Sequence, residues 1–144
     1  MSKNSLSSIL IVDDNGTMRA LLRGILRSEA SSDYEVVGSA SDCEMAMEQA
    51  LKLRPDIVCL DILMPKGNGL DVLKQIRTEL PQTVVLMVTG SSDSATVKAA
   101  LDAGASGYII KPFNSATVLS MIGEAVEKSR ALKAAAPKSD PATP

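Results

Sequence analysis

Five polar side chains directly follow short apolar runs in the sequence. They belong to Asp13, Asp14, Asp61, Thr89 and Lys111. If the apolar runs are parallel strands of one sheet, their carboxyl ends meet at one edge, where open α/β sheets hold ligands. The five side chains are therefore expected to converge on a single site.

Their residue types predict phosphoryl chemistry. Three carboxylates held together repel one another unless a cation joins them. Few, hard oxygen ligands suit Mg²⁺, which keeps several waters and usually works beside a phosphoryl group. The Lys111 amine and the Thr89 hydroxyl are suited to hold phosphoryl oxygens. We therefore expect Mg²⁺-dependent phosphoryl transfer onto or from Asp61, with its carboxylate as the nucleophile.

Each of these residues also has a structural interpretation. Asp13 and Asp14 could cap the first helix, and an Asp that follows a strand, as Asp61 does, often caps a turn or the next helix. Thr89 could cap the fourth helix in the same way, and Lys111 could be a solvated charge. Five such residues in equivalent positions favour one shared site over five separate coincidences.

Apolar periodicity predicts five strands alternating with five helices. The strands are expected at 8–12, 34–40, 57–60, 83–88 and 107–110, and the helical stripes begin at Met18, Ala46, Leu70, Val97 and Val118. This alternation implies right-handed βαβ crossovers. The predicted fold class is α/β, a doubly wound five-stranded parallel sheet in a three-layer α/β/α sandwich.

Local signals suggest how some helices begin and end. Ser41-Asp-Cys-Glu44 has the spacing of a capping box, and Asn114 is a good cap for the last helix. A helix over 91–103 would have a thin inward face of Val97, Ala100 and Leu101, which predicts weak packing and mobility.

The composition is that of one globular domain. The 144 residues are 45% hydrophobic and 22% charged, enough for one sizeable core. We assign residues 7–130 to this domain, 1–6 to an N-terminal extension, and 131–144 to a fraying helix end and disordered tail.

Composition also excludes several partners. A net charge of −2, with two tyrosines, one phenylalanine and no tryptophan, offers no surface for direct nucleic-acid binding. There is no apolar run of membrane-spanning length and no signal peptide, so we expect a cytoplasmic location and no membrane partner.

The chemically reactive residue types narrow the chemistry further. The sequence contains no histidine, which excludes His-ligated zinc, Ser-His-Asp and Cys-His nucleophiles, and a phosphohistidine on the chain itself. Cys43 and Cys59 fall in a predicted helix and strand and are expected to be reduced core residues, with a disulfide or metal site as the alternative.

Four motifs combine these residues: Val12-Asp13-Asp14, Asp61 with Met64-Pro65 and Gly69, Val88-Thr89-Gly90, and Tyr108-Ile-Ile-Lys111-Pro112-Phe113. Together they resemble the response-regulator receiver domain of two-component signalling, in particular its stand-alone, CheY-like members. The resemblance spans about residues 7–130. It implies a flavodoxin-like fold with strand order 2-1-3-4-5.

The resemblance implies a role for each acidic residue. Asp61 would be the phosphoacceptor. Asp14 and Asp61 would bind Mg²⁺ directly, together with the backbone carbonyl of Leu63, and Asp13 would bind it through water.

It also implies how the phosphoryl group is held and sensed. Thr89 and the Gly90 backbone N–H would hold phosphoryl oxygens, and Lys111 would pair with the phosphate across a cis bond to Pro112. Thr89 and Tyr108 would act as switch residues, with a half-buried core tyrosine as the alternative for Tyr108.

The implied partners are a histidine kinase or histidine phosphotransfer protein upstream and an unknown target protein downstream. The target would bind the face formed by the fourth helix, fifth strand and fifth helix. The chain would not be an enzyme beyond self-catalysed phosphotransfer and autodephosphorylation. It would be a monomer, with dimerisation on phosphorylation left open.

Some residues depart from the family pattern. The loop after Met64-Pro65 reads Lys-Gly-Asn-Gly, and Leu63 and Ser91 occupy positions that vary in the family. These departures leave the dephosphorylation rate and the partner surface open.

The alternative function is a Mg²⁺-dependent phosphatase with an aspartyl nucleophile. Such enzymes also use Asp, Thr or Ser, Lys and Mg²⁺. They require Asp-x-Asp after the first strand, whereas Leu63 stands at the second position here and Asp61 follows the third strand.

Overall fold

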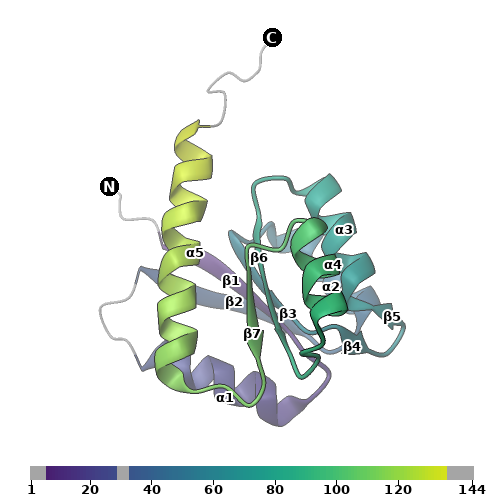
Figure 1. Ribbon diagram of the computed structural model, residues 1–144. Coiled ribbons are helices and arrows are strands. Elements are labelled where there is room, and N and C mark those ends of the chain that lie inside the picture. Colours follow the sequence, from purple (N-terminus) through teal and green to yellow (C-terminus); the bar gives the residue numbers. More distant parts are fainter. Residues whose placement is uncertain (1–5, 29–32, 136–144) are drawn as a thin grey trace.

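A five-stranded parallel sheet carries the fold (Figure 1). The structure, a computed structural model, describes residues 6–28 and 33–135. The strands are β1 (Ser7–Val12), β2 (Tyr34–Ala40), β3 (Ile57–Leu60), β4 (Leu63–Met64), β5 (Gly67–Asn68), β6 (Val84–Thr89) and β7 (Gly107–Ile110). The helices are α1 (Gly16–Arg27), α2 (Cys43–Leu53), α3 (Gly69–Glu79), α4 (Ser94–Asp102) and α5 (Ser115–Ala135).

The strands pair in the order β2-β1-β3-β6-β7, which confirms the predicted order because β6 and β7 are the fourth and fifth strands of the main sheet. The central strand β3 is buried at all four positions, as expected for a strand covered on both faces. The predicted α/β class and doubly wound topology are therefore confirmed.

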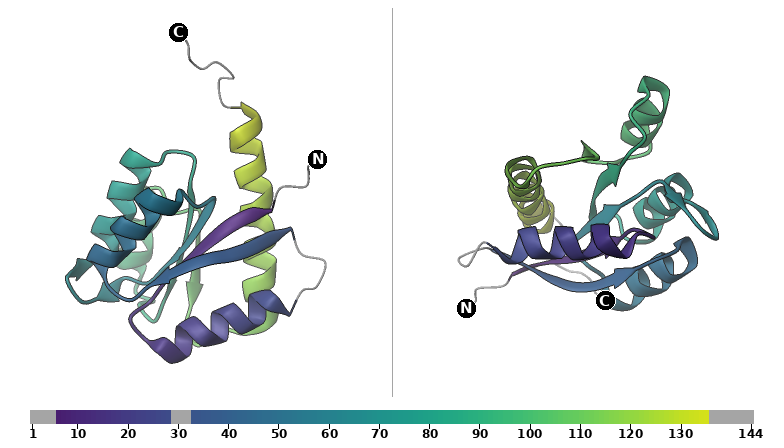
Figure 2. Two further views of the ribbon diagram at one scale, coloured as in Figure 1. Left: turned by 180° about the vertical axis from the view of Figure 1, so that it is seen from behind. Right: turned by 90° about the horizontal axis from the view of Figure 1, so that it is seen from below.

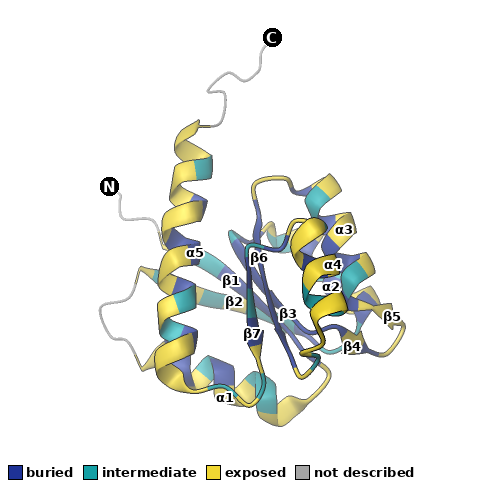
Figure 3. Cartoon of the chain, viewed as in Figure 1, coloured by how far each residue is buried: buried dark blue, intermediate teal, exposed yellow. Residues whose placement is uncertain are grey.

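Helices cover both faces of the sheet (Figure 2). Along β1, Ile9 and Ile11 pack with α1 and α5, whereas Leu10 and Val12 pack with α2, α3 and α4. This alternation follows from the two-residue period of a strand. Each fully buried Ile or Leu contributes about 2 kcal/mol by leaving water. The strands β1, β3 and β6 are accordingly the most buried elements in Figure 3.

Polar residues just before the helices cap them. The side chain of Asn15 accepts from the Met18 N–H at the start of α1, and Asn114 accepts from the Thr117 N–H at the start of α5. The capping-box prediction for Ser41 is wrong, because Asp42 is the N-cap of α2 and accepts from the Met45 N–H at 2.7 Å.

The fourth helix is shorter than predicted, and fewer of its residues are buried against the core. Its N-cap is Asp93, so α4 starts three residues after Ser91. Of the expected inward face, only Ala100 is buried, and Leu101 is 47% exposed. The thin apolar face predicted from sequence is therefore thinner still.

The last helix runs past the domain boundary expected at residue 130. It continues to Ala135, and Lys133 in its last turn pairs with Asp56 at 2.6 Å. This contact joins the end of α5 to the amino edge of the sheet. Of the predicted terminal segments, residues 1–5 and 136–144 lie outside the described residues.

Both cysteines are buried and free, as predicted. Burial raises the pKa of the Cys59 thiol to about 12. Burial, followed by the charges of Asp42 and Asp71, also raises the pKa of Cys43. Both thiols are consequently protonated, structural side chains. Among the described residues, no helix is long and apolar enough to cross a membrane.

Candidate functional site

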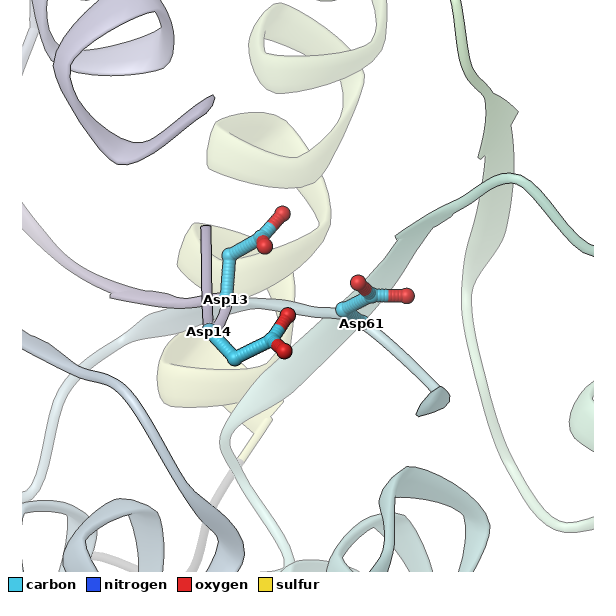
Figure 4. Close-up of side chains that lie close together, drawn as sticks. All are labelled: Asp13, Asp14 and Asp61. Carbon is cyan, nitrogen blue, oxygen red and sulfur yellow. The ribbon is translucent and has the colours of Figure 1, made fainter. Parts of the chain in front are cut away.

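The three predicted carboxylates lie together at the carboxyl edge of the sheet (Figure 4). Asp13 and Asp14 follow β1, and Asp61 follows β3, the neighbouring strand. One oxygen from each carboxylate lies within 4.8 Å of the corresponding oxygens of the other two. Sheet topology thus brings together residues that are distant in sequence.

Asp13 is almost fully buried and its carboxylate has two donors. Oδ1 accepts from the Asn15 N–H at 2.9 Å, and Oδ2 accepts from Lys111 Nζ at 2.6 Å. Asp14, in contrast, is exposed and makes no ion pair within the described part of the chain. Neither aspartate caps α1, because Asn15 performs that role.

Asp61 is 6% exposed and is held by its surroundings. Its Oδ1 accepts from the Ile62 N–H at 2.7 Å, and its Oδ2 lies 3.1 Å from Lys111 Nζ. It does not cap α3, which begins with Asn68 as N-cap. The carboxylate is therefore available for the site rather than used by a helix.

Gly69 fixes the position of the Asp61 main chain. Its N–H donates to the Ile62 carbonyl at 2.7 Å. A Cβ at Gly69 would lie 2.1 Å from the Asp61 carbonyl oxygen, a severe overlap with backbone. Only glycine lets the first turn of α3 approach residues 61–62 this closely. We call this segment the acceptor loop.

A small hairpin, rather than the irregular loop expected from sequence, connects Asp61 to α3. Leu63 pairs with Asn68 and Met64 with Gly67 in an antiparallel register. The turn places Lys66 and Gly67 at positive φ values of 63° and 137°. The side chain of Leu63 is 67% exposed at the rim, and the role of its carbonyl as a metal ligand stays a prediction.

Lys111 bridges the two buried carboxylates instead of facing solvent as a lone charge. Its side chain is 18% exposed and contacts both Asp13 and Asp61. Burial by itself lowers the pKa of Lys111, but the hydrogen bonds and negative charges of the two aspartates outweigh it and raise the pKa overall. The amine therefore stays protonated and forms an ion pair with each of the two aspartates, which offsets one of their two negative charges. The implied cis peptide bond to Pro112 is present.

Thr89 ends β6 at the same edge and is buried. It does not cap α4, and its hydroxyl instead accepts a long hydrogen bond of 3.4 Å from the Ser91 N–H. Gly90 is exposed, and the space around its missing Cβ is open. The backbone at Gly90 can therefore be approached by a small anion.

Tyr108 contacts the loop that follows Thr89. Its ring is half-buried against the core on the α2–α4 face, and its hydroxyl donates to the Ser91 carbonyl at 2.6 Å. Burial, then the charges of Asp93 and Asp61, raises the pKa of the phenol. Tyr108 is thus both a core residue and a neighbour of the site.

Arg19 was not among the residues predicted for the site, yet its Nη1 donates to the Asp13 carbonyl at 2.7 Å. An arginine in the first turn of a helix that follows an acidic loop was the available signal. Spacing alone does not distinguish this contact from a solvated charge.

The residues present fit a magnesium ion. Three carboxylates offer hard oxygen donors at short mutual distances, as Mg²⁺ requires. Asp13 and Asp61 are both paired with Lys111, whose single positive charge offsets one of the three negative charges, and Asp14 is open to solvent. This arrangement leaves room for the waters that Mg²⁺ retains.

Known proteins share the motifs and the fold. The family described as "Response regulator receiver domain" matches residues 9–123. The chemotaxis protein CheY of Thermotoga maritima is 36% identical over 116 residues, which are 81% of this chain and 94% of that protein. A CheY-like receiver domain protein from Methanospirillum hungatei has a TM-score of 0.80 at 29% identity, covering 88% of this chain and 98% of that chain.

A second similar structure is the BeF3-activated receiver domain of DrrB, with a TM-score of 0.72 at 25% identity, covering 85% of this chain and 99% of that chain. Family match, sequence identity and fold therefore agree with the four motifs. The chain belongs to the response-regulator receiver family of two-component signalling and is a CheY-like receiver domain.

Proposed function

We propose that this receiver accepts a phosphoryl group on Asp61 in a reaction that needs Mg²⁺. The carrying observation is the cluster of Asp13, Asp14 and Asp61 at one sheet edge, with Lys111 bonded to two of them. The donor would be a phosphohistidine of a histidine kinase or phosphotransfer protein, since the chain has no histidine of its own.

The chemistry is a displacement at phosphorus. An Asp61 oxygen attacks the phosphorus atom, the P–N bond of phosphohistidine breaks, and its electron pair leaves with the imidazole. The product is an acyl phosphate on Asp61. Lys111 and Thr89 would bind the phosphoryl oxygens as charge develops. Mg²⁺, when bound, supplies positive charge that offsets the repulsion between carboxylate and phosphoryl group.

In the proposed reaction the chain modifies its own Asp61 and does not act as an enzyme on a separate substrate. The phosphatase alternative is not supported by the site, because the exposed side chain of Leu63 offers no acid or base. We therefore propose phosphotransfer and autodephosphorylation as self-catalysed steps. A cytoplasmic location and a monomer that could dimerise on phosphorylation stay predictions.

The first test is metal binding. Mg²⁺ at ten times its dissociation constant is expected to stabilise the fold by about 1.4 kcal/mol, raising the melting temperature by about 4 °C. The Asp14→Ala variant should lose this effect, because Asp14 is the carboxylate of the cluster that has no ion-pair partner within residues 6–28 and 33–135 and is free to bind the metal. Calorimetric melting with and without Mg²⁺ measures both.

The matched control is Asp71→Ala, which removes an exposed carboxylate from α3 and should keep the full Mg²⁺ effect. An unchanged melting temperature of the unmodified protein in millimolar Mg²⁺ would show that the acidic cluster is not a metal site.

We further propose that phosphorylation is read out on the face formed by α4, β7 and α5, where a downstream protein would bind. The hydroxyl of Thr89 is linked to Ser91, and Ser91 is linked to Tyr108, through the two hydrogen bonds described above. If Thr89 turns toward the phosphoryl group, its bond with Ser91 is lost and the loop that holds Tyr108 can move. The few buried residues of α4 make this movement inexpensive.

Nuclear magnetic resonance tests the readout. Adding beryllofluoride, described for the similar DrrB domain as activating, is expected to shift backbone amides throughout 91–118. Tyr108→Phe removes the hydroxyl donor. In this variant, the changes in chemical shift that beryllofluoride causes at α4 should be smaller than in the wild type. If shifts are confined to residues around Asp61, the output surface lies elsewhere.

A further inference from the structure

Arg19 holds a main-chain group that the sheet cannot satisfy. The Asp13 N–H donates to the carbonyl of Ala40 at 3.0 Å, and Ala40 is the last residue of β2. Because β2 ends there, no further residue of that strand meets the Asp13 carbonyl. Arg19 Nη1 donates to this carbonyl at 2.7 Å and takes the place of the absent strand.

Within the described residues, Asp13 accepts three hydrogen bonds, and the one from Arg19 is the bond to its main-chain carbonyl. Asp13 receives a backbone donor from Asn15 and a charged donor from Lys111 at its carboxylate, so Arg19 adds a third anchor at its main chain. Gly16 starts α1 beside the guanidinium, and a Cβ there would lie 3.5 Å from Arg19 Nη2. The Arg19 guanidinium is therefore bonded to the Asp13 carbonyl and lies beside Gly16, with Asp14 between these two residues in the chain.

We infer that Arg19 is a positioning residue for the site: it sets the path of the loop so that Asp13 and Asp14 face Asp61. The inference rests on the proposed metal-dependent function. Arg19 would touch neither the metal nor the phosphoryl group, and would act through the Asp13 carbonyl.

The hydrogen bond of Arg19 and its positive charge are expected to change Mg²⁺ affinity in opposite directions. Arg19 is a cation near a cation site, so removing its charge alone would tighten Mg²⁺ binding. Loss of its hydrogen bond would instead let Asp14 and Asp13 drift apart and weaken binding. A hydrogen bond that orients a metal-binding residue is typically worth about 10- to 100-fold in affinity. The direction of the change therefore decides between the two roles.

The experiment is an isothermal titration of the full chain with Mg²⁺. Arg19→Met is expected to weaken binding about tenfold or more. Arg19→Lys keeps the charge but lacks the planar fork and the reach, and should be weakened nearly as much. The matched control is Arg23→Met, one turn further along α1, where Arg23 makes no ion pair within the described residues; its affinity should be unchanged or slightly higher.

Three results would overturn the inference. If the wild-type protein binds no Mg²⁺, the proposed function fails and this inference fails with it. If the wild type binds and Arg19→Met binds equally or more tightly, only the positioning role fails. If Arg19→Met does not fold, Arg19→Lys carries the test, and wild-type affinity in that variant would contradict a role for the specific hydrogen bond.

Discussion

Replacing Asp61 with Asn is expected to abolish phosphoryl uptake while the fold is retained. The amide has nearly the shape of the carboxylate and can still accept from the Ile62 N–H, so the acceptor loop should keep its path. It lacks the anionic oxygen that attacks phosphorus. The measurement is intact mass after treatment with acetyl phosphate and Mg²⁺.

The unmodified protein should show one base-labile phosphoryl adduct, and only when Mg²⁺ is present. Asp71→Asn, a change of the same chemistry at an exposed position on α3, should be labelled as fully as the wild type. Undiminished labelling of Asp61→Asn would place the acceptor elsewhere and remove the basis of the proposed function.

The largest loss of stability is expected from Lys111→Met measured without metal. This change leaves Asp13 and Asp61 buried without their cation, and breaking a buried pair costs about 3 kcal/mol or more. We take the lower end of that range because Lys111 is partly reached by solvent. Urea denaturation should show the loss, and added Mg²⁺ should restore part of it by neutralising the same carboxylates.

Lys98→Met is the matched control. Lys98 pairs with Asp102 at 2.8 Å on the surface of α4, where both side chains are largely exposed. Such exposed pairs contribute about 0.3–0.5 kcal/mol, so its loss should be hard to detect. Equal destabilisation by the two changes would mean that burial of the Asp13 and Asp61 carboxylates does not matter.

The ion pairs of Lys111 with Asp13 and Asp61 predict that the stability of the fold depends on pH in the alkaline range. The pKa of Lys111 is raised above its ordinary value of 10.5, so its stabilisation is fully present below pH 10.5 and is lost as pH rises through the raised value. Lys111→Met lacks this group. Above pH 10.5, the difference in stability between the wild type and this variant should therefore shrink.

The sequence by itself determined which residues meet. Apolar runs such as Ile57–Leu60 identify parallel strands, and the polar residue after each run must lie at the shared carboxyl edge. Convergence of Asp13, Asp61 and Lys111 follows from that geometry without knowledge of any side-chain contact. The strand order itself came only with the family resemblance, because periodicity does not say which strands are neighbours.

Which of several neighbouring polar residues caps each helix was decided only by the tertiary structure. Several polar residues stood within two or three positions of each helix start, and any of them could cap it. In the structure Asn15 and Asp93 are the caps, which leaves Asp14 and Thr89 for the site. Which hydroxyl or carboxylate reaches the free N–H groups depends on backbone angles that spacing does not specify.

Contacts between distant residues were equally invisible in the sequence. Lys111 lies 98 residues from Asp13, and its amine reaches both Asp13 and Asp61. The sequence predicted three mutually repelling carboxylates, and the fold shows two of them paired with this lysine. Sheet topology sets where strands end, but the reach and rotamer of each side chain depend on packing that exists only once both halves of the sheet are assembled.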